Sequence, residues 1–213
     1  MSTVPKIRLE REPEGRLRWL TLEEAERLLA ECQASKNPGL LDLVEFSLFT
    51  GLRQAEALEL TWDRVERSRG VIRIEKTKSR KRREVPLNSR ADAVLLRRVP
   101  KAEGLVFGTA RYAHFRSSWE CAVQRAKLVD FHWHDLRHTF ASWSVQRGAS
   151  LQEVKDLLGH SNLAMTLRYA HLAPERLRAA VSRLDEIALD PSTPGPRRAH
   201  ESLKLIDLSQ KSA

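Results

Sequence analysis

The sequence predicts a mainly helical fold with a small antiparallel three-stranded β-sheet. Two observations favour it: most of the chain carries apolar residues at helical spacing between capping signals, and one central stretch alternates apolar and charged residues. The 213 residues, of which 41% are hydrophobic, suffice for a packed core in one or two domains. The two cysteines, Cys32 and Cys121, are too few and too far apart for a disulfide scaffold or a cysteine-rich zinc finger.

Three helices are expected in the first part of the chain. Residues 21–24 form a capping box, which opens an amphipathic helix that runs to about residue 34. A Pro-Gly pair ends it, and a second helix is predicted over residues 40–49. After a Thr-Gly turn, residues 53–60 predict a third helix with Ala55 and Leu58 on its inner face and Ala57 as a further candidate for that face.

The pattern then changes from helical to strand periodicity. Residues 71–75 alternate apolar and charged side chains, and residues 83–87 predict a second strand. Residues 104–108 are the candidate for the third strand of the sheet. The connection between the first two is strongly basic, because residues 73–83 contain seven Lys or Arg and a single acid.

The remainder of the chain is predicted to be helical and to end in a linker. Asn88 caps a helix that stops before Pro100, and Ser150 opens a short helix that ends at Gly159. Residues 190–213 form a Pro-rich linker and a tail whose short amphipathic pattern cannot hold a helix alone. Further helices are expected over residues 112–127, 135–147, 163–169 and 174–189.

Charge is the first indication of a partner. Lys and Arg number 37 against 28 Asp and Glu, a net charge of +9, which suits a polyanion such as nucleic acid. No apolar run approaches the ~20 residues needed to span a bilayer, and the first ten residues lack a secretory signal. We therefore expect a cytoplasmic, nucleoid-associated protein with no membrane partner.

Two arginines stand where an anion would be useful. Arg53 follows a Gly turn at a helix start, where the positive helix end repels a cation unless an anion also binds there, and Glu56 can orient its guanidinium. His134 and Arg137 share one helix face and can meet the same phosphate. The alternatives are an Arg53–Glu56 surface ion pair and a capping histidine beside a surface arginine.

Three histidines and one tyrosine are further candidate site residues, and each has more than one possible role. His134 and His138 have half of a zinc-hydrolase spacing, but Asp135 stands where such an enzyme has its Glu base, and no third ligand is evident. His160 follows a helix-ending glycine, so a tight turn directs its side chain. Tyr169 is one of only two tyrosines, and by itself it would be taken as an ordinary core or surface residue.

Taken together, these motifs resemble a known family. Residues 50–56, Lys78, residues 134–138, residues 157–160 and residues 168–171 are similar, in order and spacing, to the catalytic domain of tyrosine recombinases, the phage-type integrases. Each motif is weak alone, whereas the ordered set is specific. The resemblance implies the DNA breaking-rejoining fold of that family over about residues 19–189.

The resemblance also implies a reaction. The family breaks and rejoins double-stranded DNA without a metal or a nucleotide cofactor. Tyr169 would attack the scissile phosphodiester, form a 3′-phosphotyrosyl link and release a 5′-hydroxyl. Arg53, Arg137 and His160 would hold the phosphate, His134 would act as general acid/base, and Lys78 would protonate the leaving oxygen. Glu56 and His138 would support these groups from behind.

Elementary chemistry agrees with these residue types. A free tyrosine is about one part in a thousand phenolate at pH 7, a cost of roughly 4 kcal/mol that neighbouring cations and a base can offset. Arginine suits a phosphate because its planar fork bonds two oxygens and keeps its charge. Lys76 is the rival of Lys78 for the role of acid. The residues expected to contact DNA are Lys76, Arg80, Lys81, Arg82 and Arg83.

The sequence also departs from the family. Members usually carry an N-terminal helical domain that clamps the other face of DNA, whereas residues 1–18 are a charged linker remnant here. A catalytically silent, truncated DNA-binding remnant is therefore the alternative to an active recombinase. By the resemblance, the protein would be monomeric in solution and tetrameric on DNA, with accessory DNA-bending proteins, and residues 190–213 would dock on a neighbouring copy.

Overall fold

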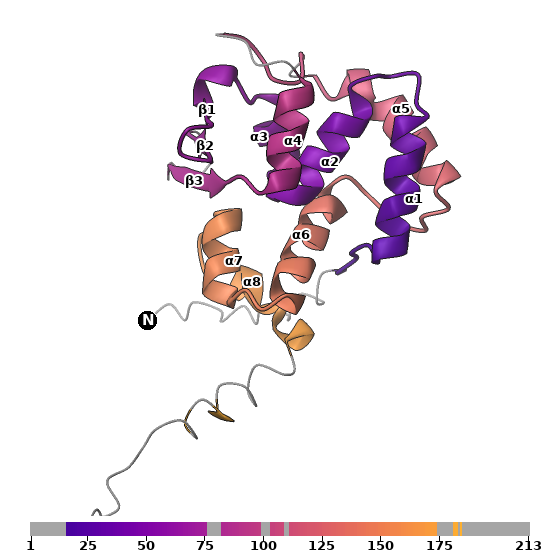
Figure 1. The fold of residues 1–213 in the computed structure, drawn as a ribbon. Coiled ribbons are helices and arrows are strands. Elements are labelled where there is room, and N and C mark those ends of the chain that lie inside the picture. The colour runs from indigo at the N-terminus through magenta and orange to yellow at the C-terminus, as the bar shows by residue number, and fades with distance from the viewer. Residues whose placement is uncertain are drawn as a thin grey trace, which may run out of the picture. The chain divides into compact units, whose positions relative to one another are not determined.

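The computed structural model describes residues 16–75, 82–98, 103–108, 111–173, 181, 182 and 184. Residues 1–173 group into one compact unit and residues 174–213 into a second. Within the described ranges, helices dominate and a single small antiparallel sheet is present, which confirms the predicted fold class (Figure 1).

The helices begin and end close to where their caps predict. The Thr21 hydroxyl accepts from the Glu24 amide and the Glu24 carboxylate accepts from the Thr21 amide. Ser150 and Glu153 form the same reciprocal pair, and the Asn88 side chain caps its helix by accepting from the Ala91 amide. The α-helices are α1 (Leu22–Gln33), α2 (Leu40–Thr50), α3 (Gln54–Leu58), α4 (Ser89–Arg97), α5 (Ala113–Arg125), α6 (His134–Gln146), α7 (Leu151–Leu158) and α8 (Ala164–Leu167). Two 3-10 helices, η1 (Trp62–Arg64) and η2 (Ala170–Leu172), complete the helical elements of the described ranges.

The turn between α2 and α3 is tightly packed. Gly51 ends α2 in the left-handed conformation at φ +64°, and a Cβ there would lie 2.4 Å from the Phe140 ring of α6. The predicted third helix is shorter than expected. The prediction that Ala55 faces inward was wrong: Ala55 is exposed, whereas Ala57 and Leu58 are buried, because α3 is a single turn.

The sheet has the order β1-β2-β3 and is antiparallel throughout. Strand β2 (Val71–Ile74) pairs with β3 (Arg83–Pro86) as predicted, with Ile72 opposite Val85. The third strand is β1 (Val65–Glu66), which precedes β2.

The predicted strand over residues 104–108 was wrong. Leu105 makes only an isolated bridge to Thr61. Val106 and Phe107 are both buried in succession, which a half-buried strand cannot do, and flanking glycines at positive φ bend the segment.

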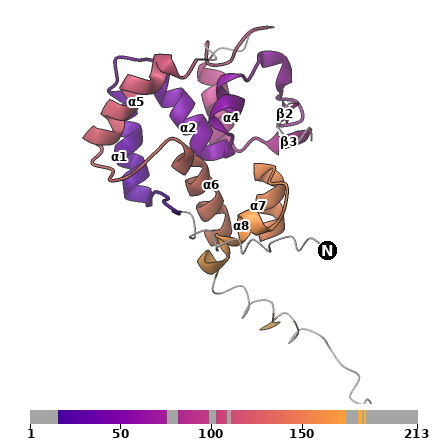
Figure 2. The ribbon, with the colours of Figure 1, turned by 180° about the vertical axis from the view of Figure 1, so that it is seen from behind.

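The core surrounds α2, which is buried along almost its whole length. Helices α1, α4 and α6 pack on it, and α7 packs between α6 and β3. In Figures 1 and 2 the pair α1 and α5 lies on one side of α2 and the sheet on the other, with α6 and α7 below. A smaller apolar cluster joins α6, α7 and Tyr169. The fold thus brings α3, β3, α6 and α7 close to one another.

Several predicted features lie outside the described residues: the tip of the basic hairpin, most of the helix over residues 174–189, and the tail over residues 190–213. Residues 16–18 of the expected N-terminal linker are described, and they contact the body. Arg18 pairs with Glu24, and Arg16 pairs with Asp135 at the start of α6. No helix within the described ranges is long and apolar enough to cross a membrane.

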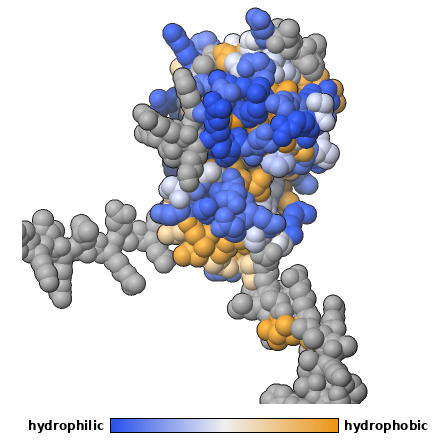
Figure 3. Space-filling view, turned by 90° about the vertical axis from the view of Figure 1, so that its left-hand side faces the viewer, coloured by the Kyte–Doolittle hydropathy of each residue, from blue (hydrophilic) through white to orange (hydrophobic). Residues whose placement is uncertain are grey.

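The face that carries the sheet is mainly hydrophilic. Figure 3 shows this side, with polar side chains over most of it and an apolar patch near its lower edge. Large apolar side chains are exposed on and beside α8: Leu163, Met165 and Leu167.

Candidate active site

Arg53 stands at the start of α3 and is held by Glu56. Its backbone N–H donates to Glu56 Oε2 and its Nη1 donates to Glu56 Oε1, both at 2.9 Å. The Arg53 side chain keeps 37% of its surface exposed. The predicted orienting role of Glu56 therefore has a geometric basis, and one edge of the guanidinium remains open to solvent.

Glu56 receives a second guanidinium from the sheet. Arg83 of β3 donates to both oxygens of Glu56, at 3.0 Å and 2.7 Å, and its side chain is only 9% exposed. Burial alone would raise the pKa of Glu56, but the hydrogen bonds and charge of Arg83, followed by those of Arg53, lower it to about 2. Glu56 is therefore a carboxylate at any physiological pH.

Arg137 of α6 is buried behind Arg53. Its Nη1 donates to the Gly51 carbonyl at 2.7 Å, and its Nη2 donates to the Leu158 carbonyl at 2.6 Å. Burial, followed by the nearby charge of Arg53, lowers its pKa to about 9 despite the opposing effect of Glu56. Arg137 thus joins the turn before α3 to the end of α7.

Three arginines meet at the C-terminal end of α7. Three consecutive carbonyls, those of Leu157, Leu158 and Gly159, each accept from a different guanidinium. The donors are, in the same order, Arg83, Arg137 and Arg53, the last at 3.4 Å. A helix end has unpaired carbonyls and a partial negative charge, so this end stabilises clustered cations. Arg53 and Arg137, far apart in sequence, are therefore neighbours.

His160 extends directly from this helix end. Gly159 takes the left-handed conformation at φ +65° and turns the chain, as the sequence predicts. The His160 Nδ1 lies 2.8 Å from the Thr166 hydroxyl. Burial, then the charges of Arg137 and Arg53, lower the pKa of His160 to about 4, so the ring is neutral at pH 7 and still offers one N–H.

His134 and His138 lie one turn apart on α6, with ring centroids 5.0 Å apart. The outer side of His134 is accessible, and burial of its inner side, then Arg137, lowers its pKa below the ordinary value. His138 is buried, and its pKa is lowered to about 4. The His138 ring is therefore neutral at pH 7.

Tyr169 lies against His138 rather than at the surface. Its side chain is 1% exposed, and its hydroxyl oxygen lies 2.6 Å from His138 Nδ1. Burial raises the pKa of Tyr169 to about 12 although Arg168 and Arg137 oppose it. The neutral His138 ring and the phenol share one hydrogen bond, and the tautomer of the ring decides which of the two donates. Tyr169 is thus held protonated, close enough to Arg137 of the cluster for that charge to act on its pKa.

The remaining predicted residues divide into two groups. Lys76, Lys78, Arg80 and Lys81 lie outside the described residues. Arg82 is exposed, as a DNA contact should be, whereas Arg83, also predicted to contact DNA, is paired with Glu56. Sequence reasoning missed the link from Arg83 to Glu56 and the contact of Thr166 with His160, because neither has a local signal.

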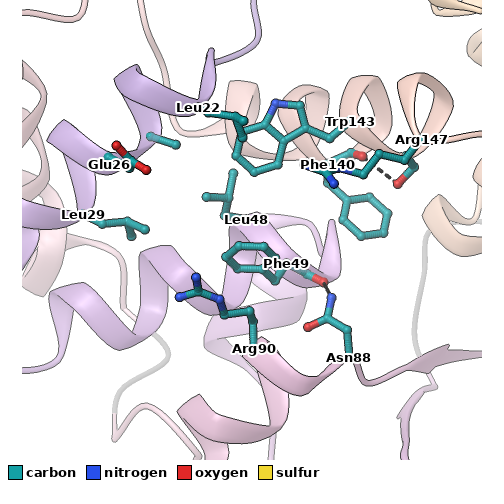
Figure 4. Close-up of a pocket in the computed structure, with 12 residues that line it drawn as sticks. Leu22, Glu26, Leu29, Leu48, Phe49, Asn88, Arg90, Phe140, Trp143 and Arg147 are labelled. Carbon is teal, nitrogen blue, oxygen red and sulfur yellow. Dashed lines mark hydrogen bonds between the residues drawn. The ribbon is translucent and has the colours of Figure 1, made fainter.

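The described residues contain a separate pocket but no candidate metal site. Among the described residues, no three His, Cys, Asp or Glu side chains form a group that could hold a metal ion. A pocket of about 470 Å³ lies between α1, α2, α4 and α6. Figure 4 shows apolar side chains around it, including Leu22, Phe49 and Trp143. Its described lining contains none of the predicted catalytic residues, so it is separate from the arginine cluster.

The sequence of the chain matches a family model. Residues 18–176 match the model described as "Phage integrase family". The chain belongs to this family. The match contains every described element from α1 to η2, so the resemblance found in the motifs extends to the whole described fold.

Curated relatives include integrases of several phages. The chain is 40% identical to an integrase of Haemophilus phage HP1 over 82% of this chain and 50% of that protein. It is 33% identical to an integrase of Salmonella phage P22 over 96% of this chain and 56% of that protein. The chain thus spans about half the length of these curated relatives.

Solved structures show the same fold. The catalytic domain of bacteriophage HP1 integrase superposes with a TM-score of 0.68 at 38% identity, covering 82% of this chain and all of that domain. The XerH site-specific recombinase, solved bound to its difH substrate before cleavage, superposes with a TM-score of 0.65 at 26% identity, over 88% of this chain and 58% of XerH. The fold is therefore that of a tyrosine recombinase catalytic domain.

Proposed function

We propose that this chain is the catalytic part of a site-specific DNA recombinase of the integrase type. The observation that carries the proposal is the convergence of Arg53, Arg137 and His160 at the end of α7. Clustered arginines with a neutral histidine form a site for a single phosphate, because guanidinium groups bind phosphate oxygens in pairs and the imidazole adds a neutral donor. Double-stranded DNA is the proposed substrate.

Binding would place a backbone phosphate against the open edge of Arg53. Arg53 Nη2 makes only a 3.4 Å contact with Gly159 O, so a phosphate can replace it at little cost. Arg137 would add its charge from behind, and His160 would donate its remaining N–H. The charge that builds up on the phosphorane oxygens would thus face donors that already lie in position.

The chemical step would be a direct displacement at phosphorus. The Tyr169 oxygen forms a bond to phosphorus, and its proton passes to His134. The bond from phosphorus to the 5′-oxygen breaks, and Lys78 supplies the proton that makes this oxygen a hydroxyl. The product is a 3′-phosphotyrosyl ester, and the same steps in reverse join it to another 5′-hydroxyl. No nucleotide is consumed, because the ester keeps the energy of the broken bond.

Attack would require Tyr169 to leave His138. The buried, hydrogen-bonded phenol has a raised pKa and cannot reach a phosphate at the surface. We therefore propose that DNA binding favours a second position of Tyr169, closer to the arginines, where the cations lower its pKa.

A nicked DNA duplex tests this function. The nick lets the strand end released by cleavage diffuse away, so that a covalent protein–DNA adduct accumulates. We expect an adduct that resists denaturation on duplexes taken from DNA that flanks the coding region, and its loss in Tyr169→Phe. Tyr112→Phe is the matched control, because it removes the other tyrosine of the chain and should leave the adduct unchanged.

One observation favours a second function, that of a catalytically silent DNA-binding remnant. It is the burial of Tyr169, which separates the proposed nucleophile from the surface. Specific binding to a duplex without any adduct would support this function and contradict the first.

Exchange between two duplexes involves four strands, and each needs one tyrosine. We therefore propose that four copies assemble on two DNA sites. Sedimentation of the protein with its target duplex should give this stoichiometry, and one protein per duplex without further assembly would contradict it.

A further inference from the structure

We infer that Arg83 is a positioning residue of the phosphate site and acts through Glu56 on Arg53 and through Leu157 on His160. This inference rests on the function proposed above and assigns to Arg83 a task other than contact with DNA. Four observations carry it: the saturation of Glu56, the burial of Arg83, its contact with α7, and the close approach of Gly159.

Glu56 has no spare capacity for hydrogen bonding. Its Oε1 accepts from Arg53 Nη1 and Arg83 Nη1, and its Oε2 accepts from the Arg53 amide and Arg83 Nη2. A carboxylate has about four lone-pair sites, and all are used. The position of the carboxylate, and with it that of the Arg53 guanidinium, therefore depends on the Arg83 fork.

Arg83 is buried where a DNA contact would be exposed. Both Arg83 and Glu56 keep less than a tenth of their side-chain surface, at 9% and 7%. The neighbouring Arg82 points to solvent, as side chains alternate along a strand. Of these two consecutive arginines, Arg82, just before β3, is therefore the one that is exposed to a backbone phosphate.

Arg83 also fixes the end of α7. Its Nε donates to the Leu157 carbonyl at 3.2 Å, three residues before His160. A Cβ at Gly159 would lie 2.8 Å from Arg83 Cδ, so the glycine permits this close approach. One side chain therefore contacts the partner of Arg53 and the turn that directs His160, and it sets the distance between two phosphate donors on separate elements.

The experiment compares variants of Arg83 with variants of two arginines beside the sheet strands, with single-turnover cleavage and DNA affinity as separate measurements. In Arg83→Lys we expect the cleavage rate at saturating DNA to fall about 10- to 100-fold with DNA affinity changed less than twofold, because an ammonium keeps the charge but cannot form the fork. Arg82→Met should do the opposite, weakening affinity and the salt dependence of binding while the saturated rate is kept. Arg69→Met, which removes a surface pair with Glu84 of β3, should change neither.

Loss of affinity in Arg83→Lys with an unchanged saturated rate would overturn the inference and make Arg83 a DNA contact. A parallel fall in melting temperature and rate, with the rate restored on cooling, would reduce Arg83 to a structural role. The double variant Arg83→Met/Glu56→Gln removes both charges, so no unpaired carboxylate is left to unfold the protein. It should fold and remain slow in cleavage.

A crystal structure of Arg83→Lys separates this inference from the proposed function. We expect the Arg53 guanidinium to leave Gly159 O and the end of α7 to move relative to α3. If both stay in place, the inference fails even where cleavage is lost. If the wild-type protein forms no adduct, the proposed function fails, and the displacement of Arg53 still decides the role of Arg83.

Discussion

The arginine cluster and the Tyr169–His138 pair are adjacent but built on opposite principles. The cluster consists of permanent charges that are held by Glu56 and by the carbonyls at the end of α7, and its outermost member is partly exposed. The pair consists of two neutral groups joined by a single hydrogen bond and buried. Arg137 and His138 are consecutive residues of α6, so one helix supports both.

Because of this difference, the groups proposed to bind the phosphate and the group proposed to attack it are in different states before DNA binds. The groups that would hold the phosphate are in position without DNA, because helix dipole, carbonyls and Glu56 offset their mutual repulsion. The proposed nucleophile, Tyr169, is buried away from the surface, and burial raises its pKa so that it stays protonated. The proposed reaction could therefore be regulated by moving only Tyr169 and its short segment, while the arginine cluster stays in place.

Substitution of Arg137 should give the largest effect. Arg137→Lys keeps one charge but cannot serve the Gly51 and Leu158 carbonyls together, so we expect adduct formation to fall by more than about 100-fold. The measurement is single-turnover cleavage of the nicked duplex. DNA affinity should change much less, since most of it comes from other phosphate contacts. An affinity loss as large as the rate loss would mean that the two regions are not separable.

Substitution of His138 tests the other region. His138→Leu removes the hydrogen-bond partner of the Tyr169 hydroxyl and leaves a buried polar group unpaired, which should lower the free energy of unfolding by about 1–3 kcal/mol. In a Tyr112→Phe background, Tyr169 is the only tyrosine, and its alkaline spectroscopic titration should then shift toward the ordinary pKa as the ring leaves its site.

The control for this result is His138→Asn, whose side-chain amide can either donate or accept in place of Nδ1. It should keep the high pKa of Tyr169 and most of the stability. If both variants titrate alike, the hydrogen bond does not hold the tyrosine, and the contrast between the two regions is lost.

The local parts of this arrangement are predictable from sequence. Capping boxes at residues 21–24 and 150–153 define helix starts, Gly51 and Gly159 define helix ends, and the spacing of Arg53 and Glu56 predicts their pairing. Each depends on neighbours within a turn, where the chain has few alternatives. The fold class follows from the same periodicities.

The non-local parts are not predictable in this way. Arg83 has the same sequence signal as Arg82, and only the packing of β3 against α7 decides which one is buried. The burial of Tyr169 likewise depends on α6, which lies far away in the sequence. The third strand was assigned to residues 104–108 because a short apolar run fits a strand and a buried loop equally well.

The histidines predict a dependence of stability on pH. The folded pKa values of His138 and His160 are about 4, below the ordinary value near 6.5, so the unfolded chain binds more protons between these limits. Their contribution is complete above pH 6.5 and is lost as the pH falls from 6.5 toward 4. The urea midpoint should therefore decrease between pH 7 and pH 5, before most carboxylates titrate.

The double variant His138→Asn/His160→Asn is the control for this dependence. Its urea midpoint should change less over the same interval, because neither amide takes up a proton. An equal decrease of the urea midpoint in the wild-type protein and in the variant would assign the effect to other histidines. The neutral state of His138 and His160 would then have no support.

The smallest effect is expected at Ser142, one helical turn beyond His138 on α6. Its hydroxyl is buried and finds no hydrogen-bond partner among the described residues. Ser142→Ala should therefore leave the free energy of unfolding unchanged or raise it by up to about 1 kcal/mol, as measured by urea denaturation. The result calibrates the His138 experiment, because both positions are buried on one face of the helix. If Ser142→Ala destabilised the protein as much as His138→Leu, the loss at His138 would reflect packing rather than its bond to Tyr169.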